Sequence, residues 1–145
     1  MPVPPFEMPV RVQPADIDAL GHVNNIVYLR WFESARITYF ERLGWLELQR
    51  ASGVGPILHS TQARFRAPVQ WPDTITVGAR IAELQEDRFT MLYEVRSERL
   101  QRVAAEGSGV VVSYDYRQRA KVPLPEAMRA GIHALEGWAG PPPRR

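Results

Sequence analysis

Two carboxylates, an imidazole, two amides and a phenol lie within thirteen residues of this chain, from Asp16 to Tyr28. The segment connects a short predicted strand to the one long apolar helix that the pattern predicts. Loops that end at a helix N-terminus often carry function, because exposed backbone N–H groups and a partial positive charge gather there. We therefore interpret residues 16–28 as a candidate active-site loop and the other elements as its scaffold.

The spacing of the loop residues suits hydrolysis. Asp18 lies three residues before Gly21, and His22 follows immediately. A carboxylate just ahead of a helix can attack an electrophile or deprotonate water, and backbone N–H groups near Asn25 can stabilise an oxyanion. Together they would perform acyl transfer to water without serine or cysteine. The alternative is that Asp16 or Asp18 caps the helix, and spacing alone does not separate the two.

The remaining polar residues of the loop have structural alternatives too. His22 is a general acid–base candidate or a residue that orients Asp18, although a lone histidine more often packs or forms hydrogen bonds. Asn24 and Asn25 could bind substrate or water, or cap the helix. Tyr28 lies one turn into the helix, where we expect a core position whose hydroxyl has a partner.

Composition excludes several classes of function. The chain has 145 residues, 45% of them hydrophobic and 23% charged, which is typical of one soluble globular domain. With no cysteine there is no disulfide and no thiolate site, and a cytoplasmic protein is expected. No apolar run approaches the roughly 20 residues that span a bilayer, and the N-terminus does not resemble a signal peptide. We expect no membrane partner.

The sequence gives little support for a metal site, a phosphate-binding loop or a nucleic-acid-binding surface. The three histidines are scattered, so no metal-ligand spacing recurs and no metal is expected. The sequence contains neither a phosphate-cradling loop nor a nucleophile elbow, so we expect no cofactor. The net charge of +2 is too small to predict a nucleic-acid partner.

The hydrophobic periodicity predicts an α+β scaffold in one domain, residues 1–145. Strands are expected at 9–14, 57–67, 74–84, 88–98 and 102–117, and helices at 25–43, ended by Gly44, and at about 125–135. We expect the core at about 9–122, a C-terminal helical segment at 123–138 and a disordered tail at 139–145. Because one helix cannot cover both faces of a five-stranded sheet, a second copy of the chain is favoured.

Arg36 breaks the apolar arc of the long helix, since it projects beside Phe32 and Leu43. A buried guanidinium without a partner is costly. Glu33, one turn earlier, is the nearest local candidate, and a subunit contact is the alternative.

The run Asp-Ile-Asp-Ala-Leu-Gly-His-Val-Asn-Asn-x-x-Tyr, which begins at Asp16, resembles the hot-dog-fold thioesterases. Specifically, it is similar to the signature D-x-D-x-x-G-H-V-N-N-x-x-Y of the 4-hydroxybenzoyl-CoA thioesterase-like group. The resemblance extends over about residues 9–122. It implies a curved five-stranded antiparallel sheet wrapped around the long helix, a homodimer or homotetramer that joins sheets edge to edge, and an active site at the subunit interface that hydrolyses acyl-CoA.

The resemblance also implies roles for individual residues. Asp18 matches the catalytic carboxylate, which acts as a nucleophile or as a general base. The backbone N–H groups near Asn25 would hold the thioester carbonyl, and His22 would assist Asp18. Asp16 then shapes or caps the loop. Residues assigned to substrate binding are Gly21, Asn24, Tyr28, Arg64 and Arg66, with Arg88, Arg117, Arg119 and Lys121 as further candidates for contacts with CoA phosphates.

Alternatives remain open within and outside the family. Acyl-carrier-protein thioesterases carry an additional asparagine where this chain has Leu20, so their full constellation is absent. The hot-dog hydratases have a longer spacing with Asn-Pro, which is not found here. A third branch uses a glutamate on the central helix, which makes Glu33 a minor candidate. A non-catalytic acyl- or CoA-binding hot-dog protein is the second hypothesis, and a nucleic-acid binder rests only on the basic isoelectric point.

Overall fold

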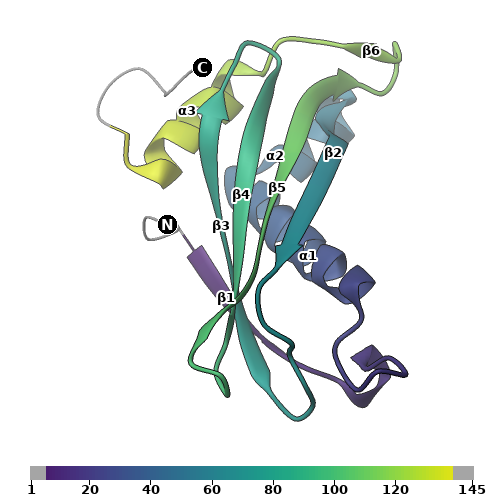
Figure 1. Cartoon of the computed structure of the whole chain (residues 1–145). Helices are drawn as coiled ribbons and strands as arrows, with labels where there is room; N and C mark the ends of the chain where they lie inside the picture. The colour runs from purple at the N-terminus through teal and green to yellow at the C-terminus, as the bar shows by residue number, and fades with distance from the viewer. Residues whose placement is uncertain (1–5, 139–145) are drawn as a thin grey trace.

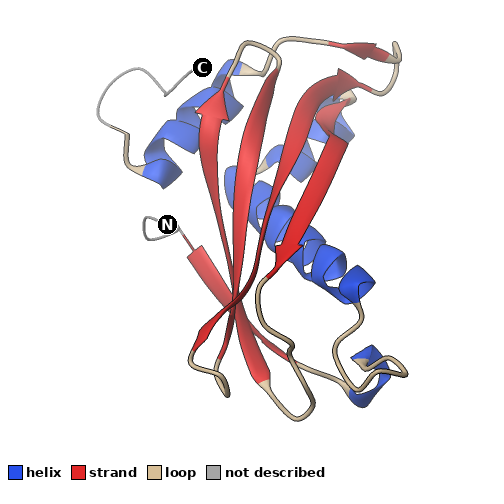
Figure 2. Ribbon diagram, viewed as in Figure 1, coloured by secondary structure: helices blue, strands red, loops and turns tan. Residues whose placement is uncertain are grey.

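The computed structural model describes residues 6–138 and consists of one curved antiparallel sheet with a long helix against its inner face (Figures 1 and 2). The elements in chain order are β1 (Phe6–Arg11), a 3₁₀ turn (Pro14–Asp16), α1 (Asn25–Leu43), α2 (Trp45–Ser52), β2 (Val54–Phe65), β3 (Thr74–Leu84), β4 (Arg88–Ser97), β5 (Arg102–Asp115), β6 (Ala120–Lys121) and α3 (Glu126–Glu136). The expected curved sheet around a long helix is confirmed.

The strand order β1-β3-β4-β5-β2 places β1 and β2 at the two edges of the sheet, and β6 adds a short pairing to β5. Every pairing is antiparallel. In β4, burial alternates from residue to residue, as expected for a strand with one face on the core. In β2, residues 58–62 are all exposed, so this edge is open on both faces of the single chain.

The core lies between α1 and the inner face of the sheet. Phe32 of α1 stacks on Tyr93 of β4, with ring centroids 4.8 Å apart. The Phe32 ring occupies the space that a Cβ at Gly107 would need, and that Cβ would also lie 2.7 Å from the Gln62 carbonyl oxygen. The absence of a side chain at Gly107 therefore allows the helix to pack directly on β5.

Several predicted boundaries were wrong. β1 spans 6–11 rather than 9–14, because the chain leaves the sheet before the 3₁₀ turn that starts at Pro14. β2 begins at Val54 rather than 57, and β6 makes six strands instead of five. Helix α2 was not predicted; its Trp45 is buried against Phe40 and Phe89. The tail predicted at 139–145 lies outside the described residues.

Within the described chain, Arg36 does not pair with Glu33, the nearest local candidate. The Arg36 guanidinium turns inward and its Nη1 donates to the Tyr93 hydroxyl at 3.1 Å, whereas Glu33 is exposed. The partner comes from β4 because the side chain points between α1 and the sheet instead of along the helix surface.

Candidate active site

The loop before α1 is a narrow turn with Asp18 at its base. Ile17 and Val23 form an antiparallel bridge, and the Asp18 backbone N–H donates to the His22 carbonyl at 2.9 Å. The Gly21 N–H donates back to the Asp18 carbonyl at 3.0 Å. Gly21 has φ +86°, a left-handed conformation that side-chain-bearing residues rarely adopt. The turn thus depends on glycine at the position that the signature specifies.

The Asp18 carboxylate is held on one side only. Its Oδ1 accepts the Leu20 backbone N–H at 2.9 Å and, more weakly, the His22 N–H at 3.5 Å. Among the described residues, Oδ2 forms no hydrogen bond, and no cation pairs with this half-buried carboxylate. One oxygen is therefore fixed by the backbone while the other is available for chemistry.

The helix start next to this loop offers a free donor. Asn24 is the N-cap of α1, and its Oδ1 accepts the Ile26 N–H at 3.1 Å, while its carbonyl accepts the Val27 N–H at 2.9 Å. The Asn25 backbone N–H meets no acceptor among residues 6–138. Because the first N–H groups of a helix carry its positive end, this N–H is suited to an oxyanion.

His22 lies beside Asp18 in the turn and is half-buried. In the part of the chain that the structure describes, its ring forms no hydrogen bond. The imidazole is consequently not committed to a structural contact in the single chain, and it remains a candidate for assisting Asp18.

Asp16 stabilises the conformation of the loop. It is buried, its Oδ2 accepts the Gln13 N–H at 2.8 Å, and its Oδ1 forms an ion pair with Arg30 at 2.7 Å. Its carbonyl accepts the Asn24 N–H at 2.9 Å. The sequence analysis did not predict that Arg30 supports the site. The available signal was its position, since a cation about one and a half turns into a helix can reach an acidic residue in the preceding loop.

Tyr28 belongs to the core of the single chain rather than to an open surface. It is 2% exposed, and its ring packs edge-on against Trp31 and Phe65, both at 5.1 Å between centroids. Burial raises the pKa of Tyr28, and the Val69 backbone partly offsets this. Val69 also accepts the Val23 N–H at 2.8 Å, so the segment after β2 supports both the loop and the helix start.

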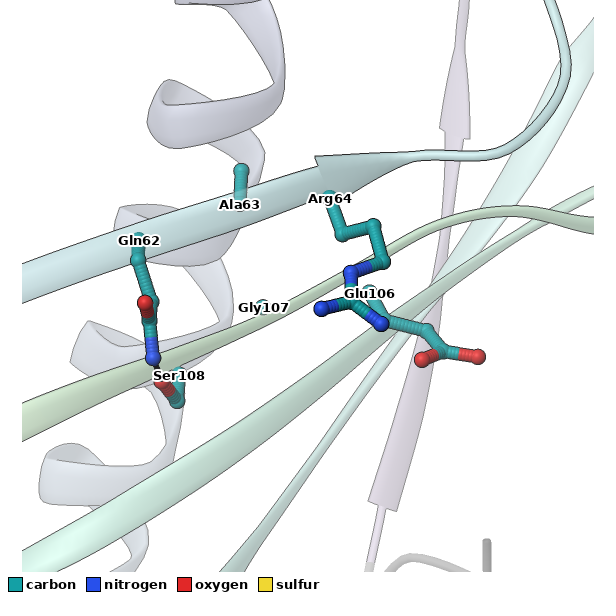
Figure 3. Close-up of a pocket in the computed structure, with 6 residues that line it drawn as sticks. All are labelled: Gln62, Ala63, Arg64, Glu106, Gly107 and Ser108. Atoms are coloured by element: carbon teal, nitrogen blue, oxygen red, sulfur yellow. Dashed lines mark hydrogen bonds between the residues drawn. The ribbon is translucent and has the colours of Figure 1, made fainter.

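Arg64 and Arg66 do not join the loop residues within one chain. Phe65 points toward Tyr28 on the α1 side, so the alternation of β2 turns Arg64 to the opposite face of the sheet. There Arg64 lines a cavity of about 270 Å³ with Gln62, Ala63, Glu106, Gly107 and Ser108 (Figure 3). Arg66 is occupied by Glu106, with Nε–Oε1 at 3.1 Å and Nη2–Oε2 at 3.2 Å.

The other basic candidates lie toward the far end of the sheet. Arg88 pairs with Asp87 at 2.9 Å, and the Arg117 guanidinium donates to the Ala51 carbonyl at 3.2 Å. Arg119 and Lys121 belong to the β5–β6 turn region, opposite the end where the loop enters α1 (Figure 1). One chain therefore separates the loop from these cations.

No group of three or more metal-ligating side chains occurs among residues 6–138. In the same residues, no helix is long and apolar enough to cross a membrane. The arrangement that the structure does assemble is a carboxylate, an imidazole and a free helix-start N–H on one loop.

A curved antiparallel sheet around one long helix is the architecture of the hot-dog thioesterases. The chain belongs to the thioesterase-like superfamily, whose family model matches residues 12–132. It is therefore a thioester hydrolase by family, and the expected fold class and enzyme class are confirmed.

Individual relatives agree with this assignment. A thioesterase from Thermus thermophilus, solved with coenzyme A and zinc, is 34% identical over 94% of this chain and 98% of its own, with a TM-score of 0.82. The acyl-CoA thioesterase YbgC of Haemophilus influenzae is 26% identical over 90% of this chain and 96% of its length. A 1,4-dihydroxy-2-naphthoyl-CoA thioesterase from Synechocystis, 22% identical over 88% of this chain and 94% of its own, shares the fold with a TM-score of 0.77.

Proposed function

We propose that the protein hydrolyses acyl-CoA thioesters, with Asp18 as nucleophile or general base and the helix start near Asn25 as the oxyanion site. The observation that carries this proposal is the Asp18 carboxylate, whose Oδ1 accepts the Leu20 N–H while Oδ2 forms no hydrogen bond within residues 6–138. The CoA bound to the Thermus thermophilus relative supports the substrate class.

The chemistry follows from the geometry of the loop. Asp18 either attacks the thioester carbonyl carbon or removes a proton from water that attacks it. In both cases negative charge develops on the carbonyl oxygen, which the Asn25 N–H and the positive end of α1 stabilise. The C–S bond then breaks, and the CoA thiolate takes up a proton. His22 is suited to deliver that proton or to orient Asp18. If Asp18 is the nucleophile, the acyl group is left on its carboxylate as an anhydride, which water hydrolyses to release the free acid and regenerate Asp18.

A second copy of the chain is part of the proposal. The open edge of β2 favours antiparallel pairing with the same edge of another subunit, in a homodimer or a homotetramer. Such pairing reverses the strand direction, so it brings the far end of one sheet, with Arg117, Arg119 and Lys121, toward the loop of the other. These cations, together with Arg64, are the proposed contacts for CoA phosphates.

The test is the variant Asp18→Asn, which keeps the shape of the side chain and its hydrogen bond to Leu20 but removes the base. We expect kcat for the best acyl-CoA to fall by at least about 100-fold. Glu126→Gln, which removes a carboxylate charge at an exposed position of α3, serves as the control and should keep wild-type kcat. Wild-type turnover by Asp18→Asn would refute the role of Asp18.

Substrate choice is tested separately with the wild-type protein. Hydrolysis is measured across short, long and aromatic acyl-CoAs and against the matching acyl-carrier-protein thioesters. We expect turnover of at least one acyl-CoA in preference to its carrier-protein counterpart, because Leu20 replaces the asparagine of the carrier-protein enzymes. Binding of acyl-CoA without hydrolysis of any substrate would identify a non-catalytic binding protein instead.

The cysteine-free composition favours a cytoplasmic site of action.

A further inference from the structure

Arg36 presents an unusual electrostatic environment. The residue is 7% exposed, and its one hydrogen bond among residues 6–138 goes from Nη1 to the neutral hydroxyl of Tyr93 at 3.1 Å. No carboxylate of the described chain lies within ion-pair distance of it. A guanidinium removed from water without an opposite charge is strongly unfavourable, so a single chain leaves this position incompletely compensated.

The guanidinium nitrogens of Arg36 that form no hydrogen bond are not completely buried. Buried polar side-chain atoms without a partner in the described chain occur at Trp45, Arg80 and Arg129, but not at Arg36. The remaining guanidinium nitrogens of Arg36 therefore retain some accessible surface. An acceptor that arrives from outside the chain can reach them.

The matching carboxylate is exposed on the same helix. Glu33 forms no hydrogen bond or ion pair within the described residues, although it lies only three residues from Arg36. Its neighbours one turn away, Leu29 and Ile37, are large apolar residues that are 37% and 38% exposed. A carboxylate surrounded by exposed apolar side chains is typical of an interface rather than of a solvated helix face.

This helix surface adjoins the open edge of β2. Leu58 and Phe65 of β2 are 38% and 44% exposed, and Phe65 packs against α1 through Tyr28. Apolar side chains thus continue from the helix to an unpaired strand edge. The surface carries both signs of charge, so it can complement itself.

We propose that a second copy of the chain packs along this surface, so that Glu33 of each subunit pairs with Arg36 of the other. This inference rests on the edge-to-edge assembly of the proposed function and specifies the contact that completes it. In a twofold interface, residue i meets j and j meets i, so one Glu33–Arg36 contact generates two equivalent pairs. Each pair supplies the opposite charge that Arg36 lacks within its own subunit.

The symmetry gives a charge-swap test in the full-length protein. Glu33→Arg places two positive charges in each contact, and Arg36→Glu places two negative charges there. We expect each variant alone to dimerise at least tenfold more weakly than the wild type in analytical ultracentrifugation. When the two variants are mixed, both contacts become attractive, so heterodimers should form at near wild-type affinity and dominate in native mass spectrometry.

The controls separate an intersubunit pair from other effects. Glu126→Arg changes an exposed glutamate of α3, outside the surface formed by α1 and β2, and should leave dimerisation unchanged. Circular dichroism verifies folding; if Arg36→Glu does not fold, Glu33→Arg and Glu33→Gln, both at an exposed position, must still weaken the dimer. Wild-type affinity for Glu33→Arg, or a mixture no tighter than either variant alone, would overturn the proposal.

The result is independent of the catalytic proposal. Asp18→Asn should be inactive but fully dimeric, because Asp18 is not part of the charge pair. A protein that shows the charge-swap rescue but no hydrolysis would refute only the proposed activity. An active wild-type protein that sediments as a monomer would refute the Glu33–Arg36 contact and the edge-to-edge assembly, but not the proposed hydrolysis.

Discussion

Arg30 of α1 binds the carboxylate of Asp16 in the preceding loop, with Nη2 and Oδ1 2.7 Å apart. The contact joins the second turn of the helix to the residue whose carbonyl accepts the Asn24 N–H. Because Asn24 is the helix cap and Asp18 lies two residues after Asp16, this ion pair holds the candidate catalytic turn against the helix start. Loop position and helix position are thereby coupled.

Removing this support should affect both stability and activity. Asp16→Ala leaves the Gln13 N–H without its acceptor and releases Arg30, so we expect a loss of about 1–3 kcal/mol in the free energy of unfolding. We also expect lower kcat/KM, since Asp18 and Asn25 are no longer held in register. Arg30→Gln should cost less, because the arginine is 60% exposed and its charge is screened. Urea unfolding and steady-state kinetics measure both; equal effects of the two variants would contradict the buried role of Asp16.

The packing of α1 on β5 predicts a contrast between two neighbouring glycines. A Cβ at Gly107 would collide with the Phe32 ring, whereas at Gly109 its nearest neighbours lie at 3.3 Å. Gly107→Ala should therefore lower the free energy of unfolding by about 1–3 kcal/mol through overpacking, and Gly109→Ala by clearly less. Denaturant midpoints compare the two variants directly. A Gly109 effect as large as that of Gly107 would show that strand propensity, not the helix contact, determines the cost.

The C-terminal helix is attached through a partly buried carboxylate. Glu136 of α3 accepts the Tyr39 hydroxyl at 2.6 Å and the Ile81 backbone N–H at 2.9 Å. Burial raises the pKa of Glu136, although the two hydrogen bonds and Arg80 act in the opposite direction. The folded state thus binds this proton more tightly than the unfolded state does. Stability from this group is therefore highest at low pH and is lost as pH rises from about 4.3 through the raised pKa.

Glu136→Gln should remove this contribution while keeping an oxygen for both donors. We expect the slope of the free energy of unfolding against pH to become flatter above about pH 4.3, where the wild-type carboxyl titrates, with stability at neutral pH retained or increased. Urea titrations at several pH values measure the slope. Glu126→Gln, an exposed position on the same helix, is the control and should reproduce the wild-type slope. An unchanged slope in Glu136→Gln would contradict the proposed titration.

Local signals explain which parts of the fold could be predicted from the sequence. The bounds of α1, residues 25–43, were predicted correctly because an amide cap, a long apolar arc and Gly44 all act within the helix itself. Helix α2 was missed because its eight residues between two glycines span only about two helical turns, which is too short for a helical period to be recognised, and burial of Trp45 against Phe40 stabilises the helix. Short helices depend on such tertiary packing more than on propensity.

Non-local contacts explain what could not be predicted about the site. The signature places Asp18, Gly21, His22 and the helix start together, since all lie in one short segment. The partner of Arg36 is 57 positions away in the sequence, and nothing local to Arg36 indicates Tyr93. Arg64 and Arg66 were assigned by charge alone, and strand alternation, which depends on register, turned Arg64 to the face opposite α1.

The backbone conformation of Gly21 predicts how substitutions affect the turn that presents Asp18. Its φ of +86° disfavours side chains, yet no atom of residues 6–138, apart from its two chain neighbours, lies within 4 Å of the position that a Cβ would occupy. Gly21→Ala should therefore cost about 1 kcal/mol or more through backbone strain alone, and it should lower kcat because relaxation of the turn moves Asp18. Gly21→Asn should be milder, since asparagine tolerates left-handed conformations better than alanine. Steady-state kinetics and thermal unfolding compare the two variants. If the larger asparagine were more harmful than alanine in both, space around the turn, and not its backbone conformation, would be the constraint.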